Sequence, residues 1–182
     1  MKTIADHILD IVQNSIRAES TLIEIIVVEN KKKDFCNITI RDNGCGMDEA
    51  TREQATNPFF TSRETRKVGL GLSLLKQNAE RTGGTFQITS EVNKGTEVNA
   101  VFQLSNVDRP PLGDIWNTYY FTLISNPKLT LNYRHETEEG KFEMLSDELK
   151  MALDGVSLLQ KEIKEAIIEM IKNNLKEIKT TD

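Results

Sequence analysis

Three groups of residues have types and spacings that suit chemistry on a nucleotide. In the first, Asp10 and Asn14 lie four residues apart in a helix-like segment, so both face the same side. The second is Asp42–Gly46 (DNGCG), which directly follows a strand-like segment. The third is Gly69–Gly71 (GLG), which opens another helix-like segment. Their order along the chain predicts a site that holds ATP and Mg²⁺ without a P-loop.

The first two groups offer partners to particular parts of ATP. Asp42 can accept a hydrogen bond from the adenine amino group, because the amine donates and a carboxylate only accepts. Gly44 and Gly46 would let the backbone pass close to the base with no side chain in the way. Asn14 carries an amide oxygen that suits a hard cation such as Mg²⁺, which keeps most of its own waters.

The phosphates would lie at the third group. Gly69 and Gly71 open a helix whose backbone N–H groups and dipole favour anions. Asp10, one turn before Asn14, could orient or deprotonate an attacking group beside the γ-phosphate. Each group alone also has a plainer explanation, as a turn, a close-packed helix start or an exposed helix face. The three groups together, in this order, favour the nucleotide site.

The composition narrows the class of protein. With 182 residues, 38% of them hydrophobic and 28% charged, the chain suits one globular domain with room for a small appendage. The net charge of -5 disfavours a nucleic-acid surface. Neither a signal region nor an apolar run long enough for a bilayer is present, so we expect a cytoplasmic protein without membrane contact. Cys36 and Cys45 are isolated, which predicts reduced thiols.

Hydrophobic periodicity places these groups on regular elements. Helices are expected over residues 4–18, 48–55 and 70–81, and strands over 22–28, 37–41, 85–90 and 97–104. The polar segment 56–68 has no period and is long for a mere connection, so we expect it to be functional or mobile. This pattern predicts an α/β (α+β) two-layer sandwich with helices over one face of a sheet.

A proline pair at residues 110 and 111 marks the best boundary, which divides the chain into residues 1–106 and 107–182. In the second part we expect a helix over 114–125, a β-hairpin turning at 138–140, and a last helix. Ser157 and Gln160 form a capping-box pattern for that helix. Its expected apolar stripe contains Leu159, Ile163, Ala166, Met170 and Ile171. We interpret this small α+β appendage as a possible partner or dimer module.

Residues 1–104 resemble the ATP-binding domain of the GHKL superfamily, which includes gyrase B, Hsp90, histidine kinases and MutL. Asn14 matches the N-box asparagine, Asp42–Gly46 the first glycine box, and Gly69–Leu72 the second. Gly95–Thr96 matches the last box, and Pro58–Ser62 (PFFTS) resembles the phenylalanine-bearing box of histidine kinases. The resemblance implies a Bergerat-type sandwich with a mixed sheet, Mg-ATP binding, and an ATP lid at residues 56–70.

Further nucleotide contacts follow from this resemblance only. The matched boxes imply contacts at Thr61, Leu70 and Thr96. Lys67 lies in the expected lid, where it could reach a phosphate or remain solvated. In the ATPase branches a glutamate commonly occupies the site of Asp10, and typical histidine kinases have asparagine there. Aspartate keeps the carboxylate that a base needs, but it is one methylene shorter.

Three functions remain open. A kinase of signal transduction would pass the γ-phosphate to a separate protein, as stand-alone anti-sigma-factor kinases do. We expect His7 to be an ordinary helix-face residue and His135 an ordinary surface residue, which leaves the acceptor in another protein. A non-kinase switch would instead report bound ATP to a partner. The segment Arg109–Asp114 resembles small ATP-binding proteins encoded beside iron-hydrogenase subunits, which implies a redox partner. A MutL-like ATPase is the third function, although the chain has no room for the usual second domain.

Overall fold

The chain forms six strands and six helices within the residues that the computed structural model describes, 1–57 and 70–181 without the side chain of Leu70. The elements are, in order, α1 (Ile4–Arg17), β1 (Leu22–Asn30), β2 (Phe35–Asp42), α2 (Glu49–Gln54), α3 (Leu70–Arg81), β3 (Thr85–Glu91), β4 (Gly95–Gln103), α4 (Ile115–Ser125), β5 (Thr130–Thr137), β6 (Gly140–Leu145), α5 (Ser146–Ala152) and α6 (Lys161–Glu177).

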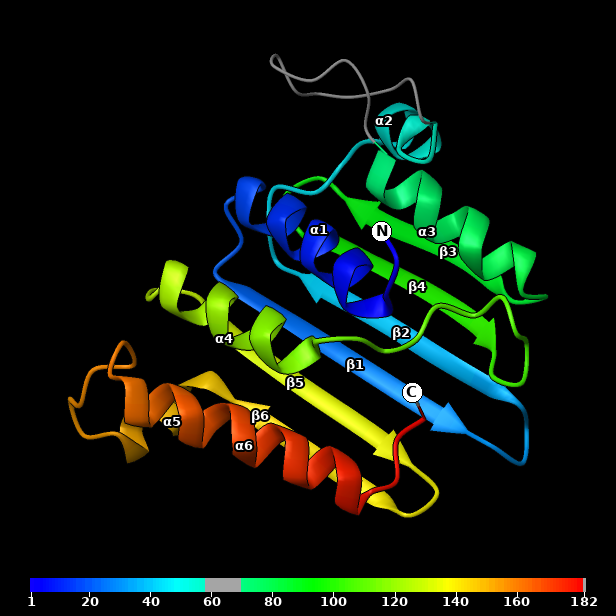
Figure 1. Ribbon diagram of the computed structural model, residues 1–182. Helices are drawn as coiled ribbons and strands as arrows, with labels where there is room; N and C mark the ends of the chain where they lie inside the picture. The colour runs from blue at the N-terminus through cyan, green and yellow to red at the C-terminus, as the bar shows by residue number, and fades with distance from the viewer. Residues whose placement is uncertain (58–69, 182) are drawn as a thin grey trace.

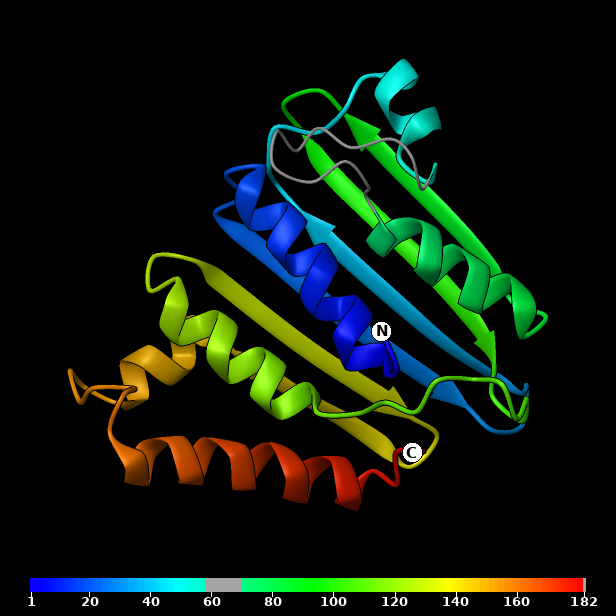
Figure 2. The same cartoon turned by 45° about the horizontal axis from the view of Figure 1, so that its top comes forward.

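All six strands belong to one mixed sheet in the order β3-β4-β2-β1-β5-β6. β1 and β5 are parallel, and every other neighbouring pair is antiparallel. Helices α1, α3, α4 and α6 lie over the same face of this sheet (Figures 1 and 2). The predicted α+β sandwich with a mixed sheet and helices on one face is therefore confirmed.

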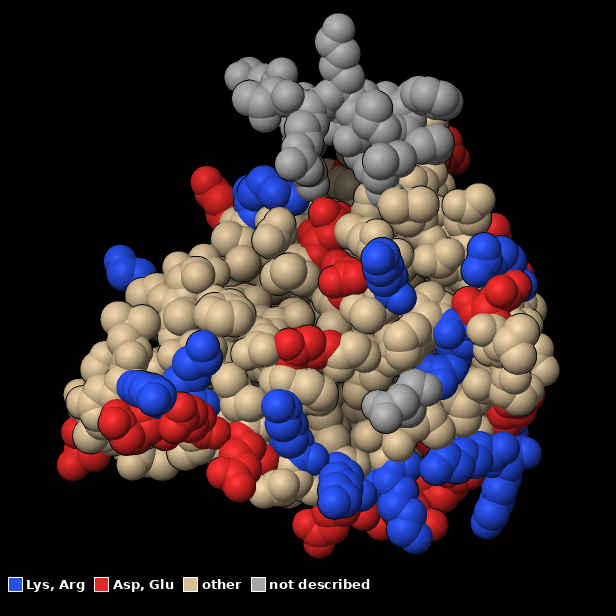
Figure 3. Space-filling view, in the orientation of Figure 1, with Lys and Arg blue, Asp and Glu red and all other residues tan. Residues whose placement is uncertain are grey.

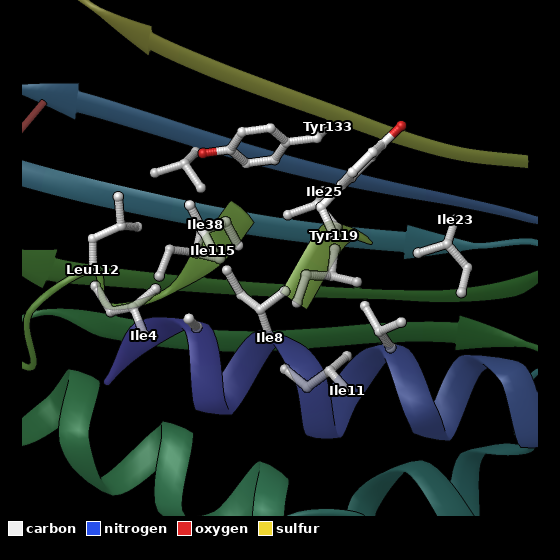
Figure 4. Packing of buried hydrophobic residues seen from close by; sticks show 14 of the residues in the cluster. Ile4, Ile8, Ile11, Ile23, Ile25, Ile38, Leu112, Ile115, Tyr119 and Tyr133 are labelled. Atoms are coloured by element: carbon white, nitrogen blue, oxygen red, sulfur yellow. The ribbon is translucent and has the colours of Figure 1, made fainter. Parts of the chain in front are cut away.

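The core lies between this helical layer and the sheet. Alternate residues of β1 are buried, as a strand with one covered face requires. On α1 the apolar residues recur every three or four positions, and a capping box at Thr3 fixes the start of the helix. Ile4, Ile8 and Ile11 of α1 are buried, and Ile4 and Ile8 point toward the side chains of the sheet (Figure 4). This packing holds α1 in one orientation over the sheet.

The residues after 106 extend the same sheet rather than form a layer of their own. β5 pairs with β1 in parallel, with Leu22 opposite Thr130 and Val28 opposite Glu136. Tyr119 of α4 and Tyr133 of β5 belong to the hydrophobic cluster that contains the residues of α1. Both parts of the chain share one sheet and one core in space. The division at 106/107 therefore stays a prediction from sequence.

The last helix begins four residues later than the sequence pattern predicts. Its N-cap is Gln160, and no side chain caps it. Ser157 instead accepts a hydrogen bond from the backbone N–H of Leu159, in a turn before the helix. The predicted capping box at residues 157 and 160 is therefore wrong, because both residues precede the first helical turn.

The predicted apolar stripe of this helix is also partly wrong. Ile167, Ile171 and Leu175 are buried, whereas Leu159 is 72% exposed and Met170 is 38% exposed. The three buried residues are spaced four apart and lie on one face of the helix. Leu159 and Met170 of the predicted stripe do not lie on this buried face. A short helix, α5, lies between β6 and α6, at a position that the sequence pattern did not specify.

Residues 178–181, which follow α6, are tied to the two neighbouring turns of the sheet. The Thr137 hydroxyl donates to the carbonyl of Ile178, and the Lys31 ammonium donates to the carbonyl of Lys179. Thr181 donates to the carboxylate of Glu29 through both its backbone N–H and its hydroxyl. We call residues 178–181 the C-terminal strap.

Beneath the strap lies a buried polar network. Glu29 Oε1 is 2.9 Å from His135 Nε2, and His135 Nδ1 is 2.7 Å from the Tyr133 hydroxyl oxygen. A carboxylate only accepts, so Nε2 donates to Glu29 and Nδ1 of a neutral ring accepts from the tyrosine. His135 is fully buried, so the expectation of a surface histidine is wrong. The alternation of β5 turns this residue toward the helical layer.

The outer surface carries mixed charge. Acidic and basic side chains are interspersed on the face that bears the helices (Figure 3). Within the described part of the chain, none of the helices has the length and apolar character needed to span a bilayer.

Candidate functional site

Residues of α1, α2 and α3 line a cavity together with residues of the strands. These three helices lie near one end of the sheet (Figure 1). The volume of the cavity is about 590 Å³, which lies in the range of small-molecule sites. Among the described residues, six of the predicted site residues line it: Asp10, Asn14, Asp42, Gly46, Gly71 and Thr96. A second hollow of about 620 Å³, on the outer side of α3, is lined by none of the predicted residues that the structure describes. The chemistry is therefore concentrated in the first cavity.

The Asp42 carboxylate is held from three sides at the end of β2. Its Oδ1 accepts from the backbone N–H of Gly44 at 2.9 Å and from that of Thr96 at 3.3 Å. Its Oδ2 accepts from the Ser15 hydroxyl at 2.6 Å. An acceptor fixed in this way suits a ligand that presents an amino group, as adenine does.

The two glycines of the first glycine motif have different surroundings. Gly46 is on the cavity wall with φ +64°, and a Cβ there would lie 2.0 Å from the carbonyl oxygen of Glu91. Gly44 is not on the wall. A Cβ at Gly44 would lie 2.5 Å from the hydroxyl of Ser20 and 2.6 Å from the carbonyl oxygen of Ala18. Gly44 therefore lets the loop pack against the end of α1, while its N–H orients Asp42.

Apolar side chains that sequence reasoning missed form other walls of the cavity. Ile88 and Val98 contribute from β3 and β4, Met47 from the loop before α2, and Leu72 from α3. A flat aromatic base gains most from such surfaces, because burying it removes apolar area from water. The alternation of β3 and β4 could have shown that Ile88 and Val98 face the helices, but not that they lie beside Asp42.

The Asp10 carboxylate lies against the first turn of α3. A Cβ at Gly71 would be only 1.7 Å from Asp10 Oδ2, so any larger residue at this position would have to displace the Asp10 carboxylate. The N-terminal end of a helix carries unpaired N–H groups and the positive end of the helix dipole. Asp10 is thus held at the end of α3 that favours negatively charged groups.

Asn14 lines the cavity one turn after Asp10, and its Oδ1 accepts a hydrogen bond from the guanidinium of Arg17. Arg17 is a further lining residue that sequence reasoning missed. Magnesium is usually bound by one or two protein oxygens together with phosphates and waters. The amide of Asn14 and the carboxylate of Asp10 suit this role, and the Arg17 guanidinium adds positive charge for phosphate groups.

Four predicted positions fall at the edge of, or outside, the described residues. Thr61, Lys67 and Gly69 lie outside them. Leu70 is the first residue of α3, but its side chain is not described. The contacts expected for these residues stay predictions.

His7 joins α1 to α3 just below the cavity. Its ring is buried, and its Nε2 accepts a hydrogen bond from the Asn78 amide at 2.9 Å. Burial, reinforced by the positively charged N-terminus, lowers the pKa of His7 to about 4, although Asp6 and Asp10 act in the opposite direction. The predicted helix-face role holds only in part, because this face packs against α3.

This lowered pKa predicts a loss of stability in mild acid. The unfolded chain takes up a proton at His7 near pH 6.5, but the folded protein takes it up only near pH 4. Stability is therefore lost as the pH falls from about 6.5 toward about 4. We expect the free energy of unfolding to drop by about 2 kcal/mol between pH 7 and pH 5 from this group alone. Urea unfolding at both pH values measures the change.

The matched control for this prediction is His7→Met, which puts an apolar side chain of similar length in place of the histidine and cannot titrate. The free energy of unfolding of this variant should fall less between pH 7 and pH 5 than that of the natural chain, by about the same 2 kcal/mol. Equal slopes for the two proteins would show that His7 does not cause the loss.

The arrangement of these residues agrees with sequence comparison. Residues 2–106 match the family described as histidine kinase-, DNA gyrase B- and HSP90-like ATPases. The chain belongs to this family. The match covers α1 to β4, and hence every element that lines the cavity.

Two bacterial relatives of the chain are sensor proteins. The chain is 38% identical over 103 residues to a candidate sensor protein of Shewanella frigidimarina, covering 56% of this chain and 16% of that protein. It is 30% identical over 94 residues to the sensor histidine kinase YvrG of Bacillus subtilis, covering 50% of this chain and 16% of that protein. The matched part thus spans about a sixth of each relative's length.

A solved structure shares the fold. The crystal structure of the N-terminal domain of a DNA repair protein superposes with a TM-score of 0.52 at 20% identity. The superposition covers 80% of this chain and 52% of that chain. Because it extends beyond the family match, the shared architecture includes part of the chain after residue 106.

Proposed function

We propose that this chain binds Mg-ATP and transfers the γ-phosphate to a separate protein in a signalling pathway of the cytoplasm. The observation that carries the proposal is the fixed carboxylate of Asp42 in the same cavity as Asp10 and Asn14. Membership of an ATPase family and the names of the sensor kinase relatives support it.

Each part of the cavity has a role in this proposal. Asp42 accepts from the adenine amino group, and Ile88 and Val98 contact the base. Asn14 provides an oxygen to Mg²⁺, which neutralises charge on the phosphates. Asp10 lies at the start of α3, where it can take a proton from the attacking group or orient it. The acceptor is a side chain of the partner protein.

Incubation with γ-labelled ATP and fractionated candidate partners tests the proposal. We expect label on a partner with the natural chain, and a loss of at least tenfold with Asn14→Ala or Asp10→Ala, a typical effect of removing a catalytic contact. Gln13→Ala, an exposed change on the same helix, serves as the matched control. Release of inorganic phosphate without transfer would identify an ATPase instead, such as a MutL-like one.

The alternative function is a switch that binds ATP and reports it to a partner, which could be part of a redox complex. A contact between the two parts of the chain favours this alternative. The first backbone N–H groups of α1, at Ile4 and Ala5, donate to the carbonyls of Pro111 and Leu112, each at 2.9 Å. A displacement of α1 by nucleotide would therefore pull on the segment that leads into α4. Tight ATP binding with neither transfer nor hydrolysis would support the switch.

A further inference from the structure

A buried hydroxyl behind the adenine-facing carboxylate has no role in the reaction proposed above. Ser15 lies on α1 next to Asn14, and only 2% of its surface is exposed. Its hydroxyl donates to Asp42 Oδ2 at 2.6 Å. Its backbone carbonyl separately accepts from the N–H of Ser20 at 3.2 Å. The hydroxyl can therefore be removed without disturbing the backbone contact.

With Ser15 in place, both oxygens of Asp42 are restrained. Two backbone N–H groups hold Oδ1, and within the described part of the chain the Ser15 hydroxyl holds Oδ2. A carboxylate held by one oxygen can still turn about its last bond, whereas one held by both cannot. Each oxygen accepts two hydrogen bonds, so Oδ2 keeps capacity for a ligand.

The restraint has a consequence for the choice of base. Adenine presents a hydrogen-bond donor, its amino group, where guanine presents a carbonyl acceptor. A fixed carboxylate binds the donor and repels the acceptor, because two acceptors brought together remain unsatisfied. A carboxylate free to turn can move away from the guanine carbonyl and lose this discrimination.

We propose that Ser15 is a positioning residue that sets the preference of this cavity for adenine over guanine nucleotides. The inference rests on one part of the proposed function, namely that the cavity binds a purine nucleotide. It does not depend on whether the phosphate is transferred, hydrolysed or left in place.

The test compares the binding of ATP and GTP, each with Mg²⁺, to the natural chain and to Ser15→Ala by calorimetry. We expect the natural chain to prefer ATP. In Ser15→Ala the affinity for ATP should fall about tenfold, as for loss of a hydrogen bond to a charged group. The affinity for GTP should change by less than about threefold, so the ratio of the two affinities falls.

Two further variants separate positioning from simple support of the fold. Ser15→Thr keeps the hydroxyl and should keep the selectivity, whereas Ser15→Cys has nearly the same shape but a weak donor and should lose it. Thr82→Ala is the matched control, because Thr82 is fully buried and donates to the carbonyl of Ala79 far from the cavity. It should lower the melting temperature without changing the ATP-to-GTP ratio.

The outcomes are distinct. Equal losses for both nucleotides in Ser15→Ala and Ser15→Cys would overturn the inference and leave the proposed function in place. Unchanged ATP affinity in a folded Ser15→Cys would do the same. If the natural chain binds neither nucleotide, the proposed function fails and this inference fails with it. Melting curves of every variant show which proteins are folded.

Discussion

Gly71→Ala is expected to destabilise the protein and to abolish ATP binding, although alanine is the better helix former. Within α3, alanine should by propensity alone stabilise the helix by about 1 kcal/mol relative to glycine. The new Cβ would, however, lie 1.7 Å from Asp10 Oδ2 and 2.6 Å from Asp10 Cγ. The overlap displaces either the carboxylate or the first turn of α3, and we expect a net loss of about 1 to 3 kcal/mol.

A double-mutant cycle with Asp10→Ala tests whether the Asp10 carboxylate causes the loss of stability. A Cβ at Gly71 lies 3.5 Å from Asp10 Cβ, an ordinary contact, so only the carboxylate causes the overlap. In the Asp10→Ala background, Gly71→Ala should therefore be neutral or stabilising. Urea unfolding of the four proteins measures the coupling, and calorimetry measures ATP binding. A Gly71→Ala protein that is more stable than the natural chain would contradict the prediction.

Glu29→Ala should have the largest effect on stability, about 3 to 5 kcal/mol. The change leaves three donors without their acceptor: the fully buried His135 ring N–H, and the partly buried backbone N–H and hydroxyl of Thr181. Each such loss costs about 1 to 3 kcal/mol. Denaturant unfolding monitored by circular dichroism gives the change in the free energy of unfolding.

Two variants control this measurement. Glu24→Ala, on the other face of β1, should cost less than about 1 kcal/mol, because its side chain is not enclosed. Glu29→Gln keeps one acceptor oxygen and should lie between the two. If Glu29→Ala and Glu24→Ala unfold at the same denaturant concentration, the network does not support the fold.

The pH dependence of the same network follows from its charge. Burial alone raises the pKa of Glu29, but hydrogen bonds from His135 and Thr181 outweigh it and lower that pKa below its ordinary value of 4.5. The contribution of Glu29 is therefore complete above about pH 4.5 and is lost as the pH falls further. This pH range lies below most of the range in which His7 takes up its proton, from about pH 6.5 to about pH 4. The losses of stability from the two groups can therefore be measured separately.

Local sequence signals were sufficient for the elements that line the cavity. The three-to-four spacing of apolar residues predicted α1, and the strand that runs into Asp42 was equally clear. The glycine motifs could be placed because glycine is needed where the chain is crowded or has a positive φ. Gly46 and Gly71 both meet this condition.

Pairs of residues far apart in the sequence could not be predicted in this way. Glu29 and His135 are 106 residues apart, and no local pattern shows that they form a buried pair. The hydrogen bond from Ser15 to Asp42 spans 27 residues and depends on the angle at which α1 crosses the sheet. The start of α6 was misjudged because Ser157 and Gln160 fit a local capping rule that the tertiary contacts override.

The parallel pairing of β1 with β5 has a consequence for any shortened version of this protein. The family match ends at residue 106, but β1 is flanked by β2 on one side and by β5 on the other. A chain cut after the match would expose Leu22–Val28 (LIEIIVV), the part of β1 that pairs with β5, as a bare sheet edge. Such an edge is a template for strand addition by a second molecule, and this one is rich in β-branched residues. The smallest fragment expected to remain monodisperse therefore extends through the β5–β6 hairpin.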